Sequence, residues 1–105
     1  MGMTEPRLTT QTIKVLGILI SRHQIQISGA DIARSTGLAS GTLYPILLRL
    51  EQAKWVKSEW EKGDPHKLGR PRRRIYSVTA LGAKSGRSAF KDMALAIGRY
   101  AWASS

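Results

Sequence analysis

Residues Ser40 to Leu50, with the sequence SGTLYPILLRL, decide how this chain folds. Four apolar positions follow the i, i+3, i+4, i+7 spacing of a helix that buries one face: Leu43, Ile46, Leu47 and Leu50. Ser40 precedes them, and we predict that its hydroxyl group caps the first turn. The outer face lacks the Glu and Lys of an ordinary solvated helix. It suits a helix that enters a DNA groove with its first turn, although an ordinary surface helix would bury the same stripe.

The charge balance indicates a polyanionic partner. The 105 residues include 17 Lys and Arg against 7 Asp and Glu, which gives a formal net charge of +10. A chain of this length forms one domain, and such an excess favours nucleic acid or an anionic membrane surface. Cysteine is absent, which excludes disulfides and thiolate metal sites and fits a cytoplasmic location. No signal peptide is recognisable, and no stretch approaches the roughly 20 apolar residues of a membrane span.

The residues before Ser40 predict the first part of a helix-turn-helix. We expect a helix from Thr9 or Thr10 to about Arg22, followed by a very short strand at residues 25–27.

Ser28 and Asp31 then form a capping-box pattern, with a hydroxyl group at the helix start and an acid three residues later. We expect a brief helix over residues 32–36, ended by Gly37 in a left-handed conformation. Two helices joined by a tight glycine-containing turn make a helix-turn-helix.

Two strands joined by a basic connection are predicted after the central helix, which should end near Ala53. The strands cover residues 55–60 and 73–78, with alternation that places Val56, Ser58 and Trp60 on the same face as Tyr76 and Val78. The connection contains Gly-Asp-Pro and Gly-Arg-Pro turns, and six Lys or Arg against one acid lie between residues 62 and 74. A basic hairpin beside a helix-turn-helix is a wing. The predicted fold is therefore mainly α with a small β-hairpin, a winged helix-turn-helix.

A long C-terminal helix is predicted from Thr79 to about Ala103 and adds a dimerisation element. Its apolar residues alternate three and four positions apart, typical of a seam between helices: Ala83, Gly86, Phe90, Met93, Ile97 and Tyr100. Part of the partner surface can be the first helix of the same chain, and a second subunit supplies the rest. We divide the chain into a flexible arm (residues 1–8), a winged-helix DNA-binding domain (9–80) and a dimerisation helix (81–105).

Two separate motifs, in this order, resemble the PadR family of transcriptional regulators. The first is SGTLYPIL at residues 40–47 with RLE at 49–51, and the second is GRPRRRIYSVTALG at 69–82. The resemblance implies a dimeric winged-helix repressor that binds palindromic operator DNA, with Tyr44 and the wing at the duplex. Lys54 stands where the family usually has glycine, and Ile75 replaces an aromatic residue.

The predicted DNA-binding residues form two groups. Basic side chains can each neutralise a phosphate: Arg34, Arg49, Lys57, Lys67, Arg70, Arg72 and Arg73. The first turn of a recognition helix reaches base edges, and its candidates here are Ser40, Gly41, Thr42, Tyr44 and Pro45. The alternative for the arginines is a solvated charge run, and the alternative for Tyr44 is packing against Leu48.

We predict a sequence-specific regulator of transcription that binds double-stranded DNA as a homodimer, acting as a repressor in the cytoplasm. The alternative is a winged-helix adaptor or interaction module for replication or partition on a mobile element, with weak DNA specificity. His23 and His66 are isolated from each other and from other ligand residues in the sequence. The sequence therefore predicts no enzyme, no metal site and no cofactor. A small apolar effector beside Phe90, Tyr100 and Trp102 at the dimer interface is left open. A membrane-surface role is disfavoured because the C-terminal helix lacks a broad basic face.

Overall fold

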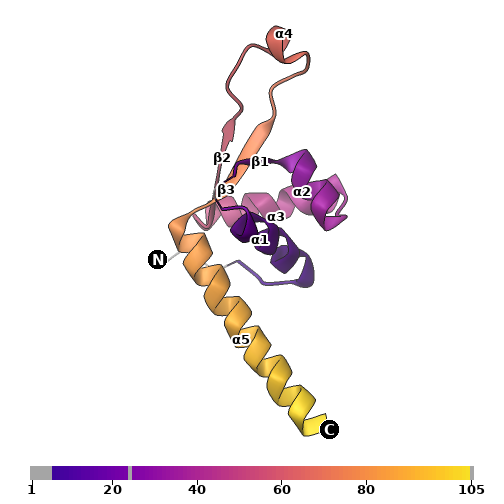
Figure 1. Ribbon diagram of the computed structural model, residues 1–105, viewed down its shortest axis with the longest axis vertical. Helices are drawn as coiled ribbons and strands as arrows, with labels where there is room; N and C mark the ends of the chain where they lie inside the picture. The colour runs from indigo at the N-terminus through magenta and orange to yellow at the C-terminus, as the bar shows by residue number, and fades with distance from the viewer. Residues whose placement is uncertain (1–5, 24, 105) are drawn as a thin grey trace.

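The computed structural model describes residues 6–23 and 25–104, with side chains as far as residue 99. Its elements follow the chain in the order α1 (Thr10–Ser21), β1 (Ile27–Ser28), α2 (Gly29–Thr36), α3 (Ser40–Gln52), β2 (Val56–Trp60), α4 (Pro65–Leu68), β3 (Arg74–Val78) and α5 (Ala80–Ser104). Figure 1 shows a body made of α1, α2, α3 and a small sheet, with the β2–β3 hairpin and α5 extending from it in opposite directions. The molecule measures 59 × 35 × 26 Å along its principal axes.

Helix α1 begins and ends as the sequence predicts. The side chain of Thr9 accepts a hydrogen bond from the Thr12 N–H at 3.2 Å and caps the first turn. Its buried side chains include Val15, Leu16 and Leu19. Leu8, which the sequence assigned to the N-terminal arm, is partly buried and packs against the core.

Strand β1 corrects the prediction of a strand at residues 25–27. Ile25 is 62% exposed, and its N–H donates to the carbonyl oxygen of Arg22 at 2.9 Å, so it belongs to the turn that follows α1. Ile27 is buried and pairs with Tyr76 of β3. Alternating β-branched residues therefore suggested a longer strand than the one that pairs with the sheet.

Helix α2 is capped as predicted but is longer. The Ser28 hydroxyl accepts from the Asp31 N–H at 3.1 Å, and Gly37 ends the helix with φ +72°. The Asp31 carboxylate binds Arg34, so the structure records only the serine half of the capping box. The helix begins at Gly29, directly after the capping Ser28, rather than at residue 32.

Helix α3 buries its predicted stripe but is not capped by Ser40, which corrects a second prediction. The extended residue at the cap is Ala39 (ψ 152°), and it makes no side-chain hydrogen bond. Ser40 is already helical, so its hydroxyl group does not occupy the capping position. Pro45 lies inside the helix, where it removes one backbone hydrogen bond. The stripe of this helix faces the core: Leu43, Ile46, Leu47 and Leu50.

The backbone at the end of α3 explains why glycine would be expected at the position of Lys54. The Lys54 N–H donates to Glu51 O and the Trp55 N–H to Leu50 O, each at 3.0 Å, which is the Schellman arrangement of a helix end. That arrangement needs a left-handed residue, and Lys54 has φ +67°. Glycine adopts this conformation without steric cost, whereas lysine does not.

The sheet is antiparallel with strand order β1-β3-β2. Val56 pairs with Val78 and Ser58 with Tyr76, so the predicted common face is confirmed. The two hairpin strands each begin one residue later than expected, at Val56 and Arg74.

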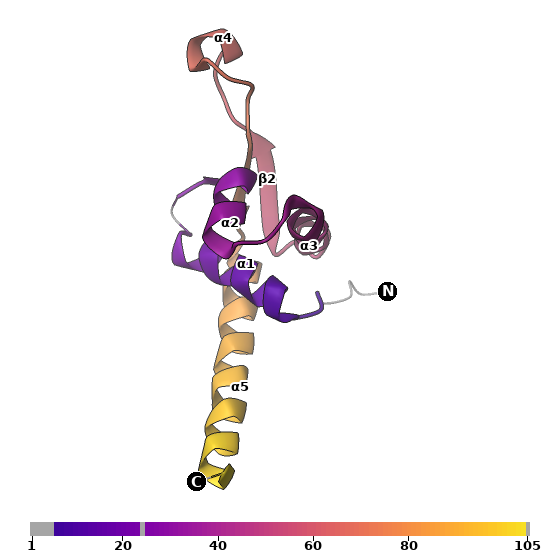
Figure 2. The same cartoon turned by 90° about the vertical axis from the view of Figure 1, so that its right-hand side faces the viewer.

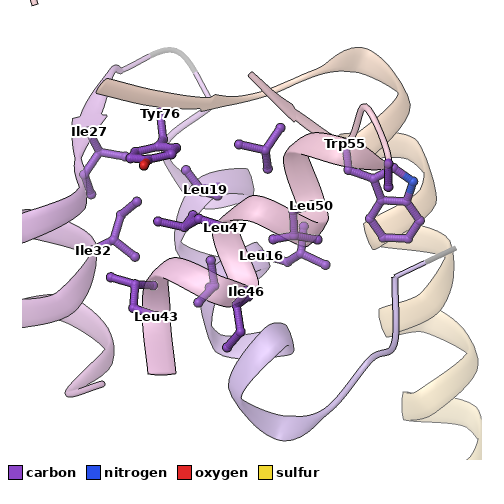
Figure 3. Close-up of a cluster of buried hydrophobic side chains, with 13 residues drawn as sticks. Leu16, Leu19, Ile27, Ile32, Leu43, Ile46, Leu47, Leu50, Trp55 and Tyr76 are labelled. Carbon is purple, nitrogen blue, oxygen red and sulfur yellow. The ribbon is translucent and has the colours of Figure 1, made fainter. Parts of the chain in front are cut away.

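The core lies between α1, α2, α3 and the inner face of the sheet (Figure 3). Aliphatic side chains from all three helices meet Tyr76 from β3, while Trp55 closes the cluster at the side of α5. Burying such side chains contributes about 1.5–3 kcal/mol each. The outcome is a rigid support behind α3.

Helix α5 is fastened to this body by its N-terminal part. The Thr79 hydroxyl accepts from the Gly82 N–H at 3.0 Å, and the Thr79 N–H donates to Trp55 O at 2.9 Å. A Cβ atom on Gly82 would lie 2.8 Å from the carbonyl carbon of Trp55, and one on Gly86 would lie 2.6 Å from the Cδ1 atom of Ile20. Glycine thus permits the close approach, and the remainder of α5 extends away from the body (Figure 1).

Candidate nucleic-acid interface

The outer face of α3 is open to solvent. Its predicted contact residues are all exposed: Ser40, Gly41, Thr42, Tyr44, Pro45 and Arg49. In Figure 2 α3 is seen end-on beside β2, lying across the long direction of the molecule that the wing and α5 follow. The exposed face of α3 and the wing are therefore two separate surfaces of the same molecule.

Tyr44 lies across the start of α2. It is 45% exposed, and a Cβ atom on Gly29 would be 2.6 Å from its hydroxyl oxygen and 3.0 Å from its Cε1 atom. Burial, followed by the charges of Tyr44 and Glu51, raises the pKa of the phenol of Tyr76, a buried residue of β3. The ring of Tyr44 thus lies against Gly29 at the start of α2.

The wing carries a short helix at its tip, which the sequence reading missed. The Asp64 side chain accepts from the His66 N–H at 3.0 Å, Pro65 occupies the first turn, and Gly69 ends α4 with φ +69°. These residues are start and stop signals for a helix, but only four residues separate them. Such a short segment shows no apolar periodicity, so the sequence predicted only turns.

The stem of the wing is braced by an ion pair between Arg70 and Glu61. The guanidinium group donates from Nη1 and Nη2 to the two carboxylate oxygens at 2.6 and 3.0 Å. The Arg73 N–H also donates to Glu61 at 3.4 Å. These hydrogen bonds lower the pKa of Glu61 below its usual value, the Arg70 bond most of all, while burial opposes the change. Arg70 is therefore committed within the wing.

The wing residues that the sequence assigned to DNA binding, other than Arg70, are exposed. Lys57, Lys67, Arg72 and Arg73 have exposed side chains. Arg72 donates from Nε to the carbonyl oxygen of Gly63 at 2.6 Å, which fixes its stem without neutralising its charge. The wing thus keeps a cationic outer surface around its internal ion pair.

A polar cluster that the sequence did not predict joins α3 to the wing. Arg74 donates to the Ser58 hydroxyl at 3.1 Å and lies 3.9 Å from the Glu51 carboxylate at the end of α3, while Ser58 donates to the same carboxylate. The Arg74 guanidinium also stacks over Trp60, 5.2 Å from the ring centroid, and Trp60 is 61% exposed. The only sequence signal was alternation, which put Arg74 on the Tyr76 face. This cluster links the two strands of the wing to the end of α3.

Arg34 lies outside both α3 and the wing in the sequence. It lies on the short α2 helix and pairs with Asp31 one turn earlier, with most of its side chain exposed. Exposed pairs of this kind contribute little to stability, so the guanidinium group can exchange its partner.

The predicted dimer seam on α5 divides into two parts. Gly86 is buried against α1, Phe90 packs partly against the core, and Ala83 is half-buried. Met93 and Ile97 are exposed, the latter by 66%. The side chains of Tyr100 and Trp102, which the sequence placed beside an effector, lie outside the described side chains.

No helix within residues 6–23 and 25–104 has the length and apolar character that a bilayer crossing requires. The same residues contain no group of three or more His, Cys, Asp or Glu side chains able to hold a metal ion.

Comparison with known proteins identifies the family. The model of the PadR-like family of transcriptional regulators matches residues 16–88. The chain belongs to this PadR-like family. Its membership places the chain among regulators of transcription. The match runs from α1 to the middle of α5 and so includes α3 and the whole wing. A search of curated proteins found no match.

Solved structures share the winged-helix fold. A transcriptional regulator homologue from Pyrococcus horikoshii OT3 superposes with a TM-score of 0.75 at 16% identity, over 88% of this chain and 84% of its own. A PadR-like transcription factor from Bacteroides fragilis gives 0.66 at 20% identity, over 87% and 89%. A MepR mutant from a multidrug-resistant S. aureus isolate gives 0.66 at 22%, over 77% and 54%. The PadR-like chain thus spans about half the length of the MepR structure.

Proposed function

We propose that this PadR-like protein is a homodimeric repressor that binds a palindromic operator through α3 and the wing. The observation that carries the proposal is the pairing of an exposed α3 face with a cationic wing on one rigid body. Residues 9–80 would then form the DNA-binding unit and residues 81–105 the dimerisation helix. The protein would act in the cytoplasm, where the DNA is.

The first turns of α3 would read the major groove. Thr42 and Tyr44 offer hydroxyl groups and Pro45 an apolar edge, whereas none of the three makes the forked hydrogen bonds that arginine or glutamine makes with a base. Specificity would rest on hydroxyl and apolar contacts together with the shape of the DNA. Arg49, farther along the helix, would contact a phosphate.

The wing would hold the neighbouring phosphates. Lys67, Arg72 and Arg73 have exposed charges for that purpose, while Arg70 would act by holding the wing in shape through Glu61. Each phosphate contact adds about 0.9 to the slope of log K against log salt.

The free half of α5 would pair with the same helix of a second copy. The exposed Met93 and Ile97 continue the seam whose first half already packs on α1. A two-fold axis through this contact would turn two recognition helices toward two half-sites.

Selection of bound fragments from a random DNA pool tests the proposal. We expect an inverted repeat with half-sites separated by one or two helical turns, about 10 or 21 base pairs, and footprinting should protect both halves. A repressor should then lower transcription in vitro from a promoter that carries the selected repeat. Weak binding to every sequence would instead support the adaptor function and refute this proposal.

A further inference from the structure

We propose that Gly29, at the start of α2, is a positioning residue that sets the sequence specificity of Tyr44 without contacting DNA. The inference rests on the proposed function, because it needs α3 to read base edges. It deepens that function by assigning part of the specificity to a residue of the neighbouring helix.

The first step is the geometry of the contact. Gly29 is buried at the first position of α2, directly after the capping Ser28. A Cβ atom built there would lie 2.6, 3.0 and 3.1 Å from the hydroxyl oxygen, Cε1 and Cζ atoms of Tyr44. Carbon atoms in ordinary contact stay about 3.5 Å apart. Only glycine therefore leaves room for the ring where it lies.

The second step concerns which side of the contact gives way. Gly29 is fixed by the backbone of a capped helix, and the three atoms it would meet are at the far end of the Tyr44 side chain. Rotation of a side chain requires less distortion than movement of a capped helix. Any larger residue at position 29 would thus turn the phenol away and leave α2 in place.

The third step is what that turn would change. Tyr44 is 45% exposed on the outer face of α3, so its ring has room to move toward the region that the proposal gives to DNA. A hydroxyl group displaced by an ångström or more loses its hydrogen bond, because these bonds are confined to about 2.5–3.0 Å. Position 29 thus determines which base edge, if any, the tyrosine meets.

The test compares Gly29→Ala, Tyr44→Ala and the double variant, using the fragment selected by the wild-type protein and a scrambled fragment of the same length. We expect Gly29→Ala to lower the preference for the selected fragment roughly five- to tenfold, the effect of losing one base contact, with little change on the scrambled one. In the Tyr44→Ala background the same substitution should have no effect. Gly17→Ala is the matched control, because a Cβ atom at Gly17 meets nothing within 4 Å.

The outcomes separate the two proposals. If the wild-type protein selects no sequence, the proposed function and this inference both fail. If it selects a sequence that Gly29→Ala prefers equally, or if Gly29→Ala lowers the preference equally without Tyr44, only the inference is overturned.

A readout without DNA covers the case in which Gly29→Ala binds too weakly to measure. The ring resonances of Tyr44, identified by their loss in Tyr44→Phe, should shift in Gly29→Ala and stay in place in Gly17→Ala. Unchanged Tyr44 resonances in Gly29→Ala would overturn the inference.

Discussion

Replacing Gly82 with alanine tests how α5 is joined to the body. The added Cβ atom would lie 2.8 Å from the carbonyl carbon and 2.9 Å from the Cα atom of Trp55, and closer still to the carbonyl oxygen. All three are backbone atoms of the residue directly before β2, so no side-chain rotation relieves the clash. The carbonyl oxygen is the nearest of the three, so the two elements must separate by roughly 1 Å or more to restore ordinary contact.

The expected loss of stability follows from two opposing effects. Overpacking a well-packed site costs about 1–3 kcal/mol, and a contact with rigid backbone belongs at the upper end. Alanine regains about 1 kcal/mol in helix propensity relative to glycine. We therefore expect Gly82→Ala to lower the free energy of unfolding by about 2 kcal/mol, which corresponds to a melting temperature about 8–15 °C lower.

Thermal unfolding followed by circular dichroism measures this change. Gly17→Ala on α1 is the control, since its Cβ atom meets nothing within 4 Å, and it should be as stable as the wild type or up to about 1 kcal/mol more stable. If Gly82→Ala melted at or above the wild-type temperature, the tight junction between α5 and Trp55 would be refuted.

Four further predictions concern the wing, the turn after α3 and the seam. Arg73→Ala should lower the salt slope of DNA binding by about 0.9 per protomer, whereas Arg70→Ala should leave the slope unchanged because Glu61 holds that guanidinium group; equal slopes for the two variants would contradict this assignment. Because Arg70 lowers the pKa of Glu61, their ion pair contributes stability above the ordinary carboxyl pKa of about 4.3 and loses it as the pH falls through the lowered value. The amide resonance of Arg73 should therefore titrate in that acidic range in the wild type and not in Glu61→Gln. Lys54→Gly should raise the free energy of unfolding by about 0.5–1 kcal/mol in urea titrations, since it removes a left-handed lysine; a decrease would mean that the lysine side chain stabilises the turn. Ile97→Asp should sediment as a monomer, and a variant that stays dimeric would place the interface elsewhere.

Much of the fold follows from local sequence patterns. The stripe of α3 is set by the spacing of four apolar residues, and the hairpin by two alternating stretches around turn residues. Gly37 ends α2 in the left-handed conformation that only a residue of its kind adopts freely. Each of these signals lies within one element, so it can be recognised without knowing the packing.

The wrong predictions assign a cap or a strand to residues next to those that are capped or paired in the structure. Ser40 stands at a capping position by composition, yet the extended residue is Ala39 and the helix simply lacks a side-chain cap. Ile25 and Ile27 alternate like a strand, but only Ile27 has a partner in β3. A single sequence does not show which of two adjacent residues is extended or paired.

The details of the candidate interface depend on contacts between elements. The spacing of Glu61 and Arg70 in the sequence does not show whether Arg70 forms an ion pair within the wing or is free, because both residues lie in the connection between the two predicted strands. The contact of Gly29 with Tyr44 likewise joins two helices. The only sign of it in the sequence was a glycine directly after a helix cap. The structural role of this glycine follows from the position of the Tyr44 ring beside it.

The braced wing has a kinetic consequence. Since one carboxylate holds the guanidinium group of Arg70 and the amide of Arg73, the loop has a defined shape in the protein without DNA. Segments that order themselves only on binding lose affinity to that transition. Here the rate of association should instead be set by diffusion and by charge steering, so it should fall steeply with ionic strength and show no slow folding phase.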